Sequence, residues 1–108
     1  MFELLQSLLK EEVVRLTETQ KRVLCNIFVA PTPRLAYEYT IGDEYKADAR
    51  LFLLDNGIVA YTSDELADLT ITSHGEELMK SLGLLDEMTG DLTDYGKGLI
   101  EESNGELQ

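Results

Sequence analysis

The stretch DEYKADARLFLLDNGIVAY, residues 43–61, decides the fold. Its first part has the 100° period of an α-helix that is apolar on two opposite sides. One apolar side holds Tyr45, Ala49, Phe52 and Leu53, and the other holds Ala47, Leu51 and Leu54. An acidic stripe and a basic stripe separate them, formed by Glu44, Asp48 and Asp55 and by Lys46 and Arg50. We therefore expect this helix to be packed on both sides, in the middle of the domain.

The end of the stretch predicts a turn and a strand. Asn56-Gly57 ends the helix, because either residue tolerates the left-handed conformation common at helix C-termini. The next four residues, 58–61, are β-branched, small or aromatic and predict a strand. Leu69–Ile71 is apolar at alternate positions and predicts the return strand, so the pair forms a two-stranded ribbon.

Three helices are expected before this stretch. Residues 2–16 have apolar residues at three- and four-residue spacing and predict an amphipathic N-terminal helix. Thr17 to Gln20 fits a capping box, which begins a helix that runs to Phe28. The residue before a proline avoids helical space, so residues 30–33 end it. Thr32-Pro33 then begins a short helix that ends near Ile41.

Two more helices are expected after the ribbon. Thr72 or Ser73 caps the first, which Gly83 stops, and a last helix runs to about Glu102. The residues 69–78 and 92–100 resemble each other, since both combine Leu-Thr, a helix start and a glycine. We interpret this similarity as a coincidence among capping residues. The whole is predicted to be one domain over residues 1–102, with residues 1–16 as an additional helix and 103–108 as a flexible tail.

Charge limits the possible partners. The 108 residues carry a net charge of −12, which disfavours non-specific binding to a polyanion. Residues 10–50 hold seven basic and seven acidic residues, whereas residues 51–108 hold thirteen acidic residues and two lysines. Any nucleic-acid interface is therefore expected in the first half.

Catalytic and metal-binding residues are scarce. Cys25 and His74 are the single cysteine and the single histidine, so neither a disulfide within the chain nor a Cys/His metal site is expected. Cys25 is interpreted as a small core residue. No metal, cofactor or enzymatic activity is predicted. The N-terminus lacks a signal-peptide pattern, and no apolar run approaches membrane-spanning length, so we expect a cytoplasmic protein without membrane contact.

The order of elements over residues 17 to 82 is similar to the winged-helix (helix-turn-helix) superfamily. The similarity is carried by LTETQKRVLCNIF (16–28), by residues 32–61 and by LTITSHGEELM (69–79). It implies an α+β fold, mainly helical, with a two-stranded β-wing. It also implies DNA binding through Asp43–Asp55 in the major groove. This chain departs from that pattern, because acidic residues dominate both the start of the helix and the wing tip at residues 63–65.

Two functions follow from these observations. The first is a small acidic, non-enzymatic regulatory or adaptor module that binds a protein; a sharper form of it competes with nucleic acid for a basic partner. Its binding surface would be either the acidic C-terminal half and wing or the N-terminal helix, which is also a route to a homodimer. The interface residues named for it are Phe2, Leu5, Leu9, Val13 and Tyr37. The second is a dimeric, sequence-specific DNA-binding transcription regulator. Its phosphate contacts would be Lys46, Arg50, Lys21, Arg22 and Arg34. The charge favours the protein partner.

Overall fold

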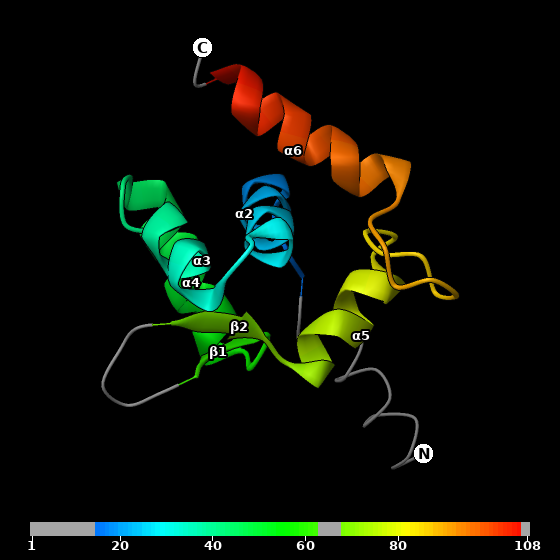
Figure 1. Ribbon diagram of the computed structural model, residues 1–108, viewed down its shortest axis with the longest axis horizontal. Coiled ribbons are helices and arrows are strands. Elements are labelled where there is room, and N and C mark those ends of the chain that lie inside the picture. The colour runs from blue at the N-terminus through cyan, green and yellow to red at the C-terminus, as the bar shows by residue number, and fades with distance from the viewer. Residues whose placement is uncertain (1–14, 63–67, 107–108) are drawn as a thin grey trace.

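A computed structural model describes residues 15–62 and 68–106 of the chain. The described residues form five helices and a two-stranded antiparallel sheet, which confirms the α+β class (Figure 1). In chain order the elements are α2 (Glu18–Val29), α3 (Pro33–Tyr39), α4 (Glu44–Asp55), β1 (Val59–Tyr61), β2 (Leu69–Ile71), α5 (Ser73–Ser81) and α6 (Asp94–Glu106). The predicted N-terminal helix lies mostly in residues 1–14, outside the described part, as does the predicted wing tip at 63–65.

The predicted helix starts are confirmed by their caps. The Thr17 hydroxyl accepts from the Gln20 backbone N–H at 3.1 Å, and the Gln20 side chain accepts from the Thr17 N–H at 2.9 Å. The Thr32 hydroxyl accepts from the Leu35 N–H at 3.1 Å, with Pro33 in the first helical turn. These caps satisfy amide groups that have no partner within the helix, so each start is fixed locally.

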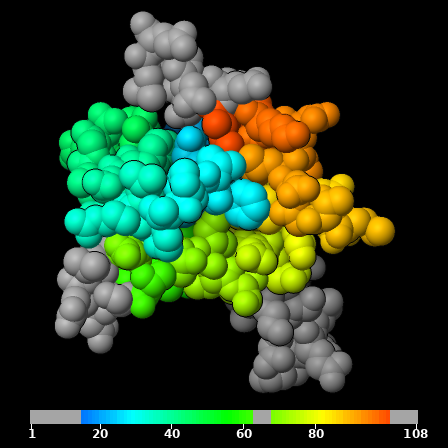
Figure 2. All heavy atoms as spheres, viewed as in Figure 1, coloured from blue at the N-terminus to red at the C-terminus, as the bar shows by residue number. Residues whose placement is uncertain are grey.

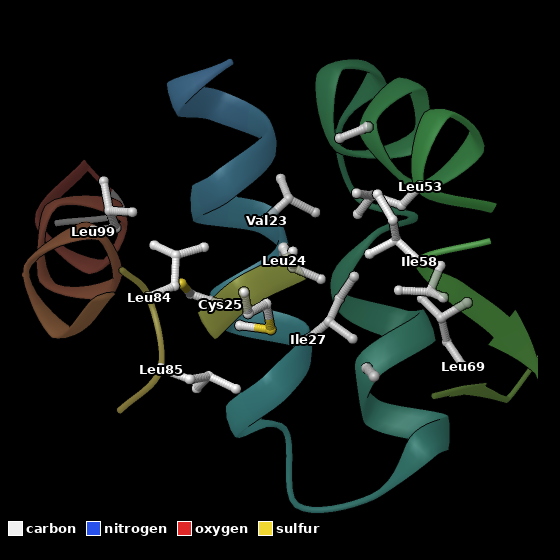
Figure 3. Close-up of a cluster of buried hydrophobic side chains, with 14 residues drawn as sticks. Val23, Leu24, Cys25, Ile27, Leu53, Ile58, Leu69, Leu84, Leu85 and Leu99 are labelled. Atoms are coloured by element: carbon white, nitrogen blue, oxygen red, sulfur yellow. The ribbon is translucent and has the colours of Figure 1, made fainter. Parts of the chain in front are cut away.

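The core surrounds α2, which contacts α3, α4, α6 and β2. Figure 3 shows Val23, Leu24, Cys25 and Ile27 of α2 between α4 and the sheet on one side and the α6 region on the other. All four are buried, which confirms Cys25 as a core residue. Because apolar side chains of several elements converge here, α2 fixes the placement of the remaining elements.

The prediction that α4 is packed on both sides is only partly confirmed for the described residues, because Leu54 on the second side packs against the core but Leu51 is exposed. Its buried residues are Lys46, Ala49 and Leu53, which lie on one side of the helix and face α2 and β1. On the opposite side, Leu51 is 51% exposed. Helical periodicity shows that a side is apolar but does not show whether another element covers it.

The sheet is short and antiparallel. Val59 pairs with Ile71, Ala60 with Thr70 and Tyr61 with Leu69, as the predicted ribbon requires. Gly57 has a φ of 69°, the left-handed conformation expected where α4 ends.

The two similar sequence segments have the same structure. In each, a threonine hydroxyl accepts from the N–H of a glycine three residues later and lies within hydrogen-bonding distance of the carbonyl of a positive-φ glycine. The first set is Gly57, Thr72 and Gly75, and the second is Gly83, Thr93 and Gly96. A single antiparallel bridge between Leu85 and Leu92 takes the place of the sheet in the second set. We interpreted the similarity of the two segments as a coincidence, but the same threonine–glycine arrangement occurs in both.

Helix α6 continues to Glu106, beyond the predicted end at Glu102. Part of the predicted tail, residues 103–106, is therefore helical, because a helix that has formed extends at little further cost in free energy. Within the residues that the structure describes, no helix is both long and apolar enough to cross a membrane.

Candidate functional site

The helix pair α3–α4 carries the two cations that the winged-helix resemblance places nearest to DNA. Lys46 is only 6% exposed. Its Nζ lies 4.2 Å from the centroid of the Tyr39 ring, 5.9 Å from that of Tyr45 and 3.3 Å from a carboxylate oxygen of Asp43. A cation between aromatic faces is held by the ring quadrupole, and burial strengthens that attraction. The Lys46 ammonium is thus enclosed by its own domain rather than presented to a phosphate.

Arg50, one turn further along α4, is held in the same way. Its guanidinium lies 5.0 Å from the centroid of the Tyr37 ring and donates to the Thr40 hydroxyl at 3.1 Å. Thr40 is fully buried and donates to the Tyr37 carbonyl at 2.7 Å. The Tyr37 and Tyr61 rings meet edge-on with their centroids 6.4 Å apart, so β1 contacts the ring that lies against Arg50.

Tyr37 is therefore not the exposed interface anchor that its sequence position predicted. It is half-buried, with Arg50 over its ring and Tyr61 at its edge. The sequence did not reveal this because both contacts come from elements far along the chain. The other predicted interface residues, Phe2, Leu5, Leu9 and Val13, lie outside the described residues.

The three remaining candidate cations lie on other elements and also have partners. Lys21 contacts Tyr95, with Nζ 3.4 Å from the hydroxyl and 5.7 Å from the ring centroid. Arg22 lies 3.6 Å from Glu18. Arg34 lies 3.9 Å from Asp68, the residue before β2. The structure thus places Lys46 against Tyr39 and Tyr45, and Arg50 against Tyr37, while the other three cations have partners elsewhere.

The solvent-facing side of α4 has the opposite character. Glu44, Asp48, Leu51 and Asp55 recur at helical spacing and are all exposed, and we call them the α4 outer face. Its three charged members are all acidic, because Lys46 points inward and Arg50 is held by Tyr37. Sequence periodicity did not reveal this face, since it placed Leu51 on a packed side. The acidic stripe beside it was the available signal.

A shallow hollow opens on another side of the molecule. It measures about 270 Å³ and lies between the end of α2, the link of residues 30–33 and strand β2. Figure 2 shows the cyan link and the lime β2–α5 region that border it. Apolar residues such as Phe28, Pro31 and Ile71 dominate the side chains around it, with Glu76 among them. A single carboxylate in such surroundings offers no nucleophile paired with a base.

The single cysteine and the single histidine have different surroundings. Burial raises the pKa of the Cys25 thiol from 9.0 to about 11, so the nucleophilic thiolate is suppressed. His74 is exposed in the first turn of α5. Within the described ranges, no group of three or more His, Cys, Asp or Glu residues is placed to hold a metal ion.

Comparisons with protein-family models, with curated proteins and with solved structures found no match for this chain.

Proposed function

We propose that this chain is a small, non-enzymatic regulatory or adaptor module of winged-helix type that acts by binding another protein. The winged-helix part of the proposal rests on the order α2, α3, α4, β1, β2, α5 and on the short connection between α3 and α4. The buried, protonated Cys25 and the exposed, isolated His74 support a non-enzymatic role.

One observation carries the choice of a protein partner. Each of the five cations named for DNA binding has a partner within the chain, which is a tyrosine ring, a buried hydroxyl or a carboxylate, and of these Arg34 is the most open, with its side chain 54% exposed. DNA affinity comes largely from Lys and Arg that neutralise phosphates and release counterions. The α4 outer face instead presents three carboxylates and a leucine. The carboxylates would repel a phosphate backbone.

The first test is fluorescence anisotropy of labelled duplex DNA, random and genomic, titrated with the full chain at several salt concentrations. We expect no binding even at low salt. A matched variant, Glu44→Lys with Asp48→Lys, reverses two exposed charges at the start of α4. It is expected to gain salt-dependent binding if α4 has the geometry of a recognition helix. Tight, salt-sensitive binding by the unaltered chain would refute the proposal in favour of a DNA-binding regulator.

The second test addresses the protein partner directly. The tagged full chain is used to capture proteins from a nuclease-treated extract, and each candidate is then purified and titrated by calorimetry. We expect a one-to-one complex that forms without nucleic acid. If no purified candidate binds directly, the adaptor role fails.

A further inference from the structure

Helix α4 also has an apolar stripe, which shares Leu51 with the α4 outer face. Ala47, Leu51 and Leu54 follow each other at i, i+4 and i+7, the spacing with which a helix presents one side to a partner. Leu51 is 51% exposed, and Ala47 and Leu54 are partly exposed. Leu54 also packs against the core, so one end of the stripe is held in place by the domain. We call these three residues the α4 stripe.

One edge of the α4 stripe is acidic. Glu44, Asp48 and Asp55 run along one edge of it, and all three are exposed. Near the opposite edge, the Arg50 guanidinium is drawn over the Tyr37 ring. The twelve residues of α4 extend about 18 Å, so the carboxylates line most of its length. A partner helix laid along the stripe would therefore meet acidic groups from end to end.

This arrangement selects among possible occupants. A second copy of the chain would bring its own three carboxylates against these three, and like charges placed together destabilise a complex. Nucleic acid is repelled for the same reason. A helix with apolar residues on one side and Lys or Arg beside them would cover Leu51 and pair with the acidic border. The net charge of −12 would also attract such a partner over a distance.

We propose that the α4 stripe binds a basic amphipathic helix of a partner protein, with an apolar side chain over Leu51 and cations on Glu44, Asp48 and Asp55. This inference rests on the proposed protein-binding function and names its surface and the chemistry of its partner.

The test uses the full chain and a fluorescein-labelled synthetic peptide designed as a Lys-rich helix with leucines at i, i+4 and i+7. Anisotropy is measured at low and at physiological ionic strength. Leu51→Glu removes the apolar contact but adds a negative charge, so it separates docking from simple attraction. We expect it to weaken binding about tenfold or more, the effect of losing a central apolar contact. A scrambled peptide of the same composition should bind more weakly than the designed one.

The matched control is Leu35→Glu on α3, the same substitution at a leucine that is 47% exposed. It should leave the affinity unchanged. A titration of the ¹⁵N-labelled, unaltered chain with the same peptide gives a readout independent of any variant's folding. We expect the largest amide shifts in residues 44–55.

Each result supports or overturns the inference. Equal or tighter binding by Leu51→Glu, or shifts centred on α5 or α6, would remove the α4 stripe as the site while leaving protein binding intact. No peptide binding at low salt would overturn the inference as well. If the unaltered chain then bound duplex DNA, the proposed function would fail with it.

Discussion

Replacing Gly75 with alanine should destabilise the protein, because the site has no room for a methyl group. Gly75 lies in the first turn of α5, where its N–H donates to the Thr72 hydroxyl at 3.0 Å. A Cβ added at this position would overlap the Ile58 carbonyl oxygen and reach 2.8 Å from the Cγ2 of Ile71. The obstacle is backbone, so it cannot rotate away, and α5 must shift from the sheet.

The magnitude follows from two opposing effects. Alanine in place of glycine favours a helix by about 1 kcal/mol. Forcing an extra methyl group into a packed site costs about 1–3 kcal/mol, here at the upper end because a carbonyl must move. The shift also stretches the Thr72 hydrogen bonds, which contribute about 1 kcal/mol. We expect a net loss of about 2–3 kcal/mol in the free energy of unfolding, or a melting temperature lower by about 10 °C or more.

The assay is urea unfolding followed by circular dichroism, with two matched glycines. Gly98→Ala in α6 meets nothing within 4 Å, so it should stabilise the protein by up to about 1 kcal/mol. Gly96→Ala would place its Cβ 2.8 Å from the Leu84 carbonyl oxygen and should fall between the two. A Gly75→Ala variant as stable as the unaltered protein would refute the close approach of α5 to the end of α4.

Three further predictions concern single side chains. Cys25 should react with a thiol reagent near pH 8 only as fast as the protein unfolds, because burial raises its pKa to about 11; labelling at the rate of free cysteine would contradict this. Lys46→Ala should lower the free energy of unfolding by about 1–2 kcal/mol, since it removes the contact with Tyr39; an unchanged urea midpoint would show that the contact contributes nothing. The Asp86 carboxylate accepts hydrogen bonds from the backbone N–H groups of Thr89 and Met88, which lower its pKa below 3.8. Its contribution to stability is therefore present above pH 3.8 and is lost as the pH falls through the lowered pKa of the folded state. Carbon NMR of the carboxyl group during an acid titration measures that pKa, and an ordinary value would contradict the prediction.

Two helix starts and one helix end were predictable, because each depends on residues that are adjacent in the chain. The Thr17–Gln20 capping box, the Thr32-Pro33 start and the Asn56-Gly57 stop each depend on a few adjacent residues, and all three are confirmed. The antiparallel ribbon was predictable from β-branched residues on both sides of a polar loop. The winged-helix assignment itself stays a prediction.

The contacts that the cations make were not predictable, because their partners come from other elements. The spacing of Lys46 and Arg50 shows that they share a stripe, but no local rule places the rings of Tyr39 and Tyr37 against them. The same limit applies to Leu51, whose exposure depends on whether a neighbour covers it. The helical period therefore grouped the residues of α4 correctly. It did not predict the tyrosine contacts of Lys46 and Arg50 or the exposure of Leu51.

The contacts of Lys46 and Arg50 with tyrosine rings make the exposed surface of α4 more acidic than its composition. The helix contains three carboxylates and two cations, yet the carboxylates face solvent while Lys46 is enclosed and Arg50 is held over an aromatic ring. Turning both cations outward would break two cation–π contacts of about 1–2 kcal/mol each before any phosphate was gained. That loss of about 2–4 kcal/mol corresponds to roughly 30- to 1,000-fold in affinity. A conformation of α4 that turned both cations toward DNA is therefore penalised by the fold, whereas the proposed basic helix would require no such rearrangement.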